Sequence, residues 1–394
     1  MKFENTSMIP WKLKCPPHLV LENDAALKVG VYAKQLGITK ALLVTDKVMR
    51  EIGLPEKIIN AGKKDNLEFA VYHDVEPEPP VDNPNAALEI YKKNNCNGVI
   101  GLGGGSVLDV AKATAMLATN SRKFEDYVGI DKVENRCAPL MLMPTTSGTG
   151  SETSSFSIMM VNGSKMGVVD QKLMADIAIV DPKLTITVPR TVTASTGLDT
   201  FAHHLDSLFS KGGSRLCDLL CLEGIRIVTR YLRKACADGE NLEARYWMSY
   251  ASTLGGVVMN MTDGAAANHA LAFALGAKHV SHGLANAVML PHVFYKVAKA
   301  EHEKVVLMGE AMGENMEGIS GHEAVEIVGK ALTSLVEDVG CYVSIERFGI
   351  DEGDLEFLIE ESIGQKRVMG HATYQMTENE IKDVFINALN VDKK

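Results

Sequence analysis

The chain has 394 residues, 46% of them hydrophobic and 23% charged, which is typical of a globular protein with one large or two medium domains. Its formal net charge of −10 argues against nucleic acid or an anionic membrane surface as a partner. No apolar run reaches membrane-spanning length, and the first residues lack the apolar core of a signal peptide. Seven scattered cysteines, with no CxxC spacing, predict free thiols and a cytoplasmic location.

The first half of the chain, residues 1–187, alternates short apolar runs with amphipathic stretches. The candidate strands are Ala41–Thr45, Glu68–Tyr72, Gly98–Leu102, Leu140–Met143 and Asp176–Val180. Helical patterns lie between them, for example over Asn85–Asn94 and Val107–Leu117. This alternation predicts an α/β domain with a mostly parallel sheet covered by helices.

A glycine-rich turn follows the third candidate strand. The segment 98–106 reads GVIGLGGGS, and a helical pattern begins directly after it. Glycines let backbone N–H groups approach a pyrophosphate, and the positive end of the helix dipole favours its charge. The motif matches neither GxGxxG nor the P-loop consensus, so a simple tight turn is an equal interpretation.

Two more polar features come at strand ends, where parallel α/β sheets bind nucleotides. The segment 144–152, PTTSGTGSE, offers five hydroxyl groups and two glycines; a loop that caps a helix is the alternative. Asp46 ends the strand ALLVTD, where an acid can bond a ribose and repel a 2′-phosphate, which favours NAD over NADP. An N-cap for the next helix is the alternative role of Asp46.

From residue 188 onward, strand-like runs nearly disappear. The helical patterns cover Asp199–Phe209, Arg215–Lys234, Leu242–Met261, Ala265–Leu275, Glu301–Met312 and His322–Val339. We therefore expect a second, all-α domain over residues 188–394.

Histidines gather in one apolar segment of this second domain. Four of the eleven lie within Asn268–Val293, at positions 269, 279, 282 and 292. Upstream, Asp199 and His203 are four residues apart and therefore share a helix face. One carboxylate and three imidazoles would suit Fe²⁺ or Zn²⁺. The alternatives are a helix cap for Asp199 and satisfied core positions for the histidines.

Four segments, in this order and spacing, resemble the iron-dependent (group III) alcohol dehydrogenase family: GGGSVLDVAK (103–112), PTTSGTGSE (144–152), TGLDTFAHHLDS (196–207) and NHALAFALG…SHGLANAVMLPHV (268–293). The resemblance implies a dinucleotide-binding domain, 1–187, and a helical metal- and substrate-binding domain, 188–394, in a dehydroquinate synthase-like architecture. It further implies a metal-dependent, NAD(H)-linked alcohol dehydrogenase or aldehyde reductase. Its substrate would be a small primary alcohol or aldehyde, neutral or anionic, and it would assemble as a homodimer or larger homo-oligomer.

Site residues carry over from the same motifs. The metal ligands, through which catalysis would act, are Asp199, His203, His269 and His282. The cofactor-binding residues are Asp46, Gly104, Gly105, Ser106, Asp109, Thr145, Thr146 and Lys165. The substrate pocket would include Phe156 and Phe273; Phe273 stands where many relatives have a further histidine, so a proton relay through that position is absent. Fe²⁺ is the family expectation and Zn²⁺ the alternative, while His279 and His292 have supporting roles.

Two other functions stay open on the sequence. Dehydroquinate-synthase-like lyases share this architecture and use NAD and a metal without net oxidation, with a more basic phosphate pocket. A non-catalytic binding protein could retain the fold, although the intact ligand positions argue against it.

Overall fold

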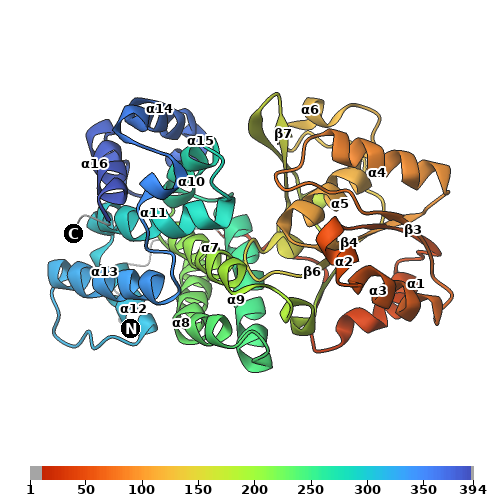
Figure 1. The fold of residues 1–394 in the computed structure, drawn as a ribbon, viewed down its shortest axis with the longest axis horizontal. Coiled ribbons are helices and arrows are strands. Elements are labelled where there is room, and N and C mark those ends of the chain that lie inside the picture. The colour runs from red at the N-terminus through yellow and green to blue at the C-terminus, as the bar shows by residue number, and fades with distance from the viewer. Residues whose placement is uncertain (1–10, 392–394) are drawn as a thin grey trace. The chain divides into compact units, whose positions relative to one another are not determined.

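The computed structural model describes residues 11–391 (Figure 1). They form two compact units. The α/β unit consists of Cys15–Pro189 and Asp238–Gly256, and the helical unit consists of Arg190–Ala237 with the described parts of Met1–Lys14 and Val257–Lys394. No helix of residues 11–391 is long and apolar enough to cross a membrane.

The α/β unit is built on a six-stranded sheet in which every neighbouring pair is parallel. In spatial order its strands are β1 (His18–Leu21), β9 (Ile177–Val180), β6 (Leu140–Pro144), β4 (Gly98–Gly103), β2 (Lys40–Val44) and β3 (Glu68–Tyr72). This confirms the predicted parallel sheet. The strand β1 was not predicted; its apolar run is only three residues long, and none of its four residues is fully buried at the sheet edge.

Both faces of this sheet are buried. Leu42 and Leu142 pack into one apolar cluster with helices α4 (Asp82–Lys93) and α5 (Gly105–Leu117). Their neighbours Leu43 and Met143 pack into a second cluster with α1 (Val29–Gln35) and α3 (Leu54–Lys63). Side chains alternate along a strand, so burial of both faces explains why the strands read as continuous apolar runs.

A second, three-stranded sheet was not among the predicted elements. It contains β5 (Gly129–Ile130), β7 (Phe156–Val161) and β8 (Ser164–Val169), with β7 and β8 antiparallel. Asn162 and Gly163 join these two strands with positive φ angles of 51° and 81°. An Asn-Gly pair is suited to this tight hairpin turn, since both residues tolerate a left-handed backbone.

The helical unit has no β-strand among its described residues, as the sequence predicted. Its longer helices are α7 (Arg190–Leu208), α8 (Arg215–Ala237), α10 (Ala267–Gly276), α11 (His282–Val297), α12 (His302–Met312), α13 (Gly321–Asp338), α14 (Leu355–Gly364) and α16 (Glu378–Leu389), with a short α15 (Lys366–His371). Helix α9 (Leu242–Met261) is divided, because its residues up to Gly256 belong to the α/β unit.

Close packing of α7 on α8 depends on one glycine. A Cβ atom at Gly224 would overlap Nε2 of His204, which is fully buried on α7. His204 therefore packs between the helices, while its neighbour His203 points elsewhere on the same helix.

Candidate active site

Helix α7 provides the first two side chains of the candidate site. Asp199 and His203 lie one turn apart and are 1% and 3% exposed. A buried carboxylate costs free energy unless charges or hydrogen bonds compensate it. The surroundings of Asp199 therefore indicate what the site accommodates.

The other two side chains come from α10 and α11. His269 lies in the first turn of α10, and His282 is the first residue of α11. A Cβ at Gly283 would lie 3.1 Å from the carbonyl oxygen of Ser195 on α7, a tighter contact than side chains normally make. The glycine after His282 thus lets the start of α11 approach α7, and this explains the His-Gly pair in the sequence.

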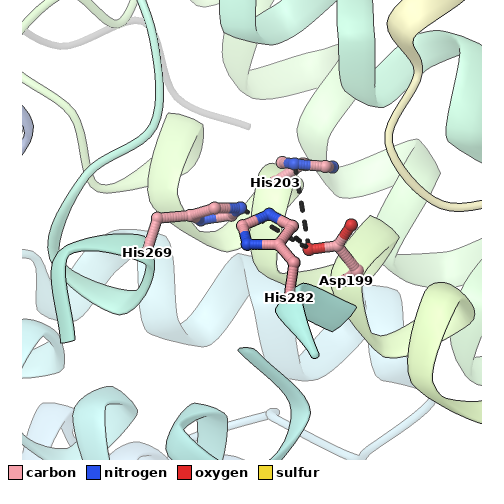
Figure 2. A group of neighbouring side chains, drawn as sticks. All are labelled: Asp199, His203, His269 and His282. Carbon is pink, nitrogen blue, oxygen red and sulfur yellow. Dashed lines mark ion pairs between the residues drawn. The ribbon is translucent and has the colours of Figure 1, made fainter. Parts of the chain in front are cut away.

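These four side chains converge (Figure 2). Each offers one ligand atom, and the four atoms lie within 4.8 Å of one another. Oδ1 of Asp199 lies 3.6 Å from Nε2 of His269, 3.6 Å from Nε2 of His282 and 4.0 Å from Nε2 of His203. The rings of His203 and His269 stack at 4.7 Å. Such a group of one oxygen and three nitrogens is a suitable donor set for Fe²⁺ or Zn²⁺.

Asp206 orients His269 from behind. Its Oδ2 lies 2.8 Å from Nδ1 of His269, and it also accepts the backbone N–H groups of Ala266 and Asn268. A carboxylate only accepts, so the neutral ring of His269 carries its proton on Nδ1 and keeps a lone pair on Nε2. That Nε2 atom is buried and has no hydrogen-bond partner among the described residues, which fits a metal ligand. Asp206 was missed in the sequence, although its position seven residues after Asp199 places both on one helix face.

A second polar residue connects two of the four side chains. Nδ2 of Asn286 donates to Oδ1 of Asp199 at 2.8 Å and lies 3.2 Å from Nε2 of His282. Its own Oδ1 accepts from Nδ2 of Asn268 at 2.9 Å. Asn286 was also missed, although it follows His282 by one helical turn.

The electrostatics of the group favour positive charge near Asp199. Burial alone would raise the pKa of Asp199, but the imidazoles of His203, His282 and His269 hold it below its usual range. Burial alone would lower the pKa of His269, but the carboxylates of Asp199 and Asp206 raise it to about 9. The negative charge of Asp199 and Asp206, which raises this pKa, would equally favour a divalent cation.

Aromatic side chains complete one side of this group. The ring of Phe273 stacks on His282 with centroids 5.6 Å apart and meets His269 edge-on at 6.3 Å. It therefore covers two imidazoles with an apolar surface. His279 is exposed in the turn before α11, and His292 stacks on Tyr342, so neither belongs to the converging group.

In the α/β unit, the glycine turn and the hydroxyl loop meet at the carboxyl edge of the sheet. Gly103 pairs with Pro144 in register, which brings Gly104 next to Thr145. A Cβ at Gly104 would meet nothing closer than Oγ1 of Thr146 at 3.5 Å, so space is open beside the first turn of α5. Oγ1 of Thr145 is buried and lacks a hydrogen-bond partner within residues 11–391. Open space, a helix N-terminus and an unsatisfied hydroxyl fit a phosphate group.

A buried ion pair holds the hydroxyl loop in place. Nζ of Lys112 donates to Oγ of Ser151 at 2.8 Å and to the carbonyl oxygen of Phe156 at 2.7 Å, and lies 3.6 Å from Oδ1 of Asp109. Asp109 accepts one hydrogen bond from the hydroxyl of Ser151 at 2.6 Å and another from the N–H of Ile158 at 3.0 Å. Burial raises the pKa of Asp109 and lowers that of Lys112. Both oxygens of Asp109 are therefore engaged within the protein.

Helix α9 holds the same loop from its other side. Oγ1 of Thr153 donates to the carbonyl oxygen of Thr253 at 2.9 Å, and Oγ1 of Thr253 donates to Glu152 at 2.9 Å. A Cβ at Gly256 would overlap the backbone of Gly150. The loop thus depends on a segment about a hundred residues further along the chain.

The remaining candidate residues lie as follows. Asp46 caps helix α2 (Lys47–Glu51), because its Oδ1 accepts a hydrogen bond from the N–H of Met49 at 2.8 Å. One of its carboxylate oxygens thus has the N-cap role that was the alternative to ribose binding. Nζ of Lys165 pairs with Glu78 at 2.6 Å. Phe156 begins β7 and is partly exposed.

A group of one carboxylate and three imidazoles, buried except for His282, occurs here with a parallel sheet that has a glycine turn at its carboxyl edge. This combination is typical of metal-dependent enzymes that use a nucleotide. Residues 16–182 match the family described as iron-containing alcohol dehydrogenase, and residues 193–389 match the C-terminal part of the Fe-containing alcohol dehydrogenase family. The chain belongs to the iron-containing alcohol dehydrogenase family.

Individual relatives are similar in sequence or structure over nearly the whole chain. Long-chain-alcohol dehydrogenase 1 of Geobacillus thermodenitrificans is 36% identical over 356 residues, 89% of this chain and 90% of the relative. The NAD-dependent methanol dehydrogenase of Bacillus methanolicus is 33% identical over 88% of this chain and 92% of its own. The crystal structure of a 1,3-propanediol oxidoreductase superposes with a TM-score of 0.93 at 32% identity, covering 96% of this chain and all of that one. The family resemblance and the fold class predicted from sequence are thus confirmed, and the protein is an alcohol oxidoreductase.

Proposed function

We propose that this protein is a metal-dependent, NAD(H)-linked alcohol dehydrogenase that also works as an aldehyde reductase. In this proposal residues 1–187 form the dinucleotide-binding domain and residues 188–394 the metal- and substrate-binding domain. The observation that carries the proposal is the convergence of three Nε2 atoms on one carboxylate oxygen of Asp199. Cytoplasmic location and homo-oligomeric assembly belong to the same proposal; free thiols at all seven cysteines support the first.

Asp199, His203, His269 and His282 would hold the divalent ion, Fe²⁺ by family and Zn²⁺ as the alternative. When bound, such an ion polarises a carbonyl group or lowers the pKa of an alcohol. The protein contributes orientation: Asp206 keeps the proton of His269 on Nδ1, so that Nε2 faces the group. Phe273 contributes an apolar surface against the rings of His269 and His282.

The cofactor would bind at the carboxyl edge of the parallel sheet. Gly104, Gly105 and Ser106 offer backbone N–H groups at the start of α5 for a pyrophosphate, with Thr145 and Thr146 beside them. Asp46 would bond the ribose and disfavour a 2′-phosphate. Bound nicotinamide would accept or supply the hydride.

Two further residues would act on the cofactor less directly. The carboxylate of Asp109 is engaged within the protein, so its contribution goes through the loop it holds. Lys165 would contact a cofactor only after its ion pair with Glu78 is broken. NAD is supported by two relatives: one is named NAD-dependent methanol dehydrogenase, and the structure of a sulfoacetaldehyde reductase from Bifidobacterium kashiwanohense, TM-score 0.88 at 27% identity over 97% of this chain and 99% of that chain, contains NAD⁺.

The substrate would be a small primary alcohol or its aldehyde. Relatives are named for long-chain alcohols, methanol, 1,3-propanediol and sulfoacetaldehyde. Phe156 and Phe273 are the proposed pocket residues, and an aromatic surface favours an apolar substituent next to the reacting carbon.

The test is NADH oxidation with a panel of neutral, carboxylated and sulfonated aldehydes. The protein is stripped with a chelator and then reloaded with Fe²⁺ or Zn²⁺. We expect activity only after reloading, with a clear preference for one class of aldehyde. If no aldehyde consumes NADH in any metal state, the dehydrogenase assignment fails in favour of the lyase or of a non-catalytic protein.

A further inference from the structure

Asn286 lies at the point where two of the converging side chains meet. It is fully buried on α11, and its Nδ2 is 2.8 Å from Oδ1 of Asp199 and 3.2 Å from Nε2 of His282. It is an amide, so it carries no charge and adds none to the site.

The orientation of this amide is determined by its partners. The carboxylate of Asp199 only accepts hydrogen bonds, so the NH₂ group of Asn286 must face it. The opposite end, Oδ1, accepts from Nδ2 of Asn268, which is also fully buried. An exchange of the two ends would place two acceptors together and two donors together in a buried position, at a cost of about 1–3 kcal/mol for each unsatisfied group.

The amide in turn determines which oxygen of Asp199 faces the imidazoles. Oδ1 is the atom that lies within 4.0 Å of all three Nε2 atoms, and Oδ1 is also the atom that Asn286 holds. Rotation of the carboxylate about its Cβ–Cγ bond would break this hydrogen bond. The position of one oxygen is thus fixed by a residue that is not itself in the converging group.

We propose that Asn286 is a positioning residue that makes Asp199 present a single oxygen, Oδ1, to a metal ion held by the four side chains, so that one coordination position would stay open. The proposal rests on the proposed metal-binding function of the four side chains. Carboxylates bind metals through one or two oxygens, so a freely rotating Asp199 would add a fifth protein donor. The chain therefore uses a neutral amide to limit the number of donor atoms.

Cobalt is a suitable probe, because the visible spectrum of Co²⁺ reports its coordination and does not depend on turnover. The test variant is Asn286→Leu, which keeps the approximate shape and removes the donor. We expect weaker visible absorption per bound Co²⁺, as coordination number rises, and an affinity for Co²⁺ about 10–100-fold lower. Asn268→Ala, which frees the amide of Asn286 without removing it, should shift the spectrum in the same direction by less.

The matched control is Ser207→Ala, since the hydroxyl of this buried α7 residue lies 3.4 Å from Oγ1 of Thr262 and its removal takes no atom from the four converging side chains. Its Co²⁺ spectrum should equal that of the unaltered protein. Should Asn286→Leu not fold, the same measurement on Asn286→Ala decides.

Two negative outcomes are distinguishable. If His269→Ala loses the Co²⁺ spectrum while Asn286→Leu and Asn286→Ala keep the unaltered one, the ligand set stands and the role of Asn286 is refuted. If His269→Ala itself keeps the spectrum, the ligand set is wrong and the proposal for Asn286 is overturned together with it.

Discussion

The two units of this chain build their candidate sites by opposite means. In the helical unit, charged and polar side chains converge, and further side chains such as Asp206 and Asn286 hold them. In the α/β unit, the candidate cofactor edge presents backbone and small residues, while the charged pair Asp109 and Lys112 on α5 is largely buried and holds the loop through Ser151. The candidate metal site depends on the functional groups of its side chains, and the candidate cofactor edge depends on the small volume of its residues.

This contrast makes different substitutions informative in each unit. A change of functional group should matter most in the helical unit, whereas a change of volume should matter most at the cofactor edge. The following predictions examine that contrast, from the largest expected effect to the smallest.

Removal of one converging imidazole should have the largest effect. His269→Ala deletes a donor atom and leaves Asp206 without its partner, so turnover should fall by more than the 10–100-fold that is usual for supporting residues. Metal content after dialysis should fall with it. His279→Asn is the control, because His279 is exposed with a φ of 65°, which asparagine tolerates. Near-normal activity of His269→Ala would remove this residue from the ligand set.

Loss of the buried lysine should show that the α/β unit uses charge for stability. Lys112→Met leaves the carboxylate of Asp109, which is only 15% exposed, without its cation, which should destabilise the protein by about 3 kcal/mol. Chemical denaturation measures the change. Lys183→Met, which disrupts an exposed pair with Asp24, should cost no more than about 1 kcal/mol. Equal losses for the two variants would contradict a structural role for the buried pair.

A neutral replacement behind the metal site should weaken metal binding without unfolding the protein. Asp206→Asn keeps the shape but no longer requires the proton of His269 on Nδ1, so metal affinity should fall about 10–100-fold. Competition with a coloured chelator measures this affinity. Unchanged metal affinity would show that the hydrogen bond between Asp206 and the His269 ring does not tune the metal site, and that Asp206 serves only to bind the backbone N–H groups at the start of α10.

A single methyl group should disturb the cofactor edge. Gly105→Ala would place a Cβ 2.7 Å from Cγ2 of Thr149, and overpacking of this kind costs about 1–3 kcal/mol. We expect a higher KM for NADH with unchanged metal affinity. The double variant Gly105→Ala with Thr149→Ser removes the opposing methyl group and should restore the KM. A failure to restore it would mean that space does not limit this edge.

Glu380 gives the smallest expected effect and is a reference residue that belongs to neither candidate site. Burial would raise its pKa, but bonds from Lys299, Tyr374 and the backbone of Thr377 hold it at about 2, below the ordinary 4.5. Its stabilisation is therefore complete above about pH 4.5 and is lost as the pH falls through about 2. Glu380→Gln should lower the melting temperature slightly at pH 7, by an amount that shrinks toward pH 2. A constant difference at all pH values would exclude a charge effect.

Much of this architecture was predictable from sequence patterns. Strands β2, β4, β6 and β9 of the parallel sheet are almost entirely buried and therefore read as apolar runs. The four converging side chains are one carboxylate and three imidazoles in an apolar part of the chain, which is a recognisable pattern for a metal site. The edge strand β1 and the hairpin β7–β8 are half-exposed and lack that signal.

The supporting residues were not predictable in the same way. Asn286 and its partner Asp199 are 87 residues apart, and asparagine has many ordinary uses. Lys112 follows a helical pattern that gives no sign that its charge is buried. Supporting contacts depend on three-dimensional neighbours, and sequence spacing does not give those neighbours.

Helix α9 has a consequence for the order in which the chain can fold during synthesis. All strands of the parallel sheet have been made by residue 180, yet the loop that contains Thr153 bonds to Thr253 and packs against Gly256. The ribosome makes α7 and α8 before it reaches this segment. About fifty residues of the helical unit, Arg190–Ala237, are therefore made before the candidate cofactor loop of the α/β unit can close, so the two units cannot mature strictly one after the other.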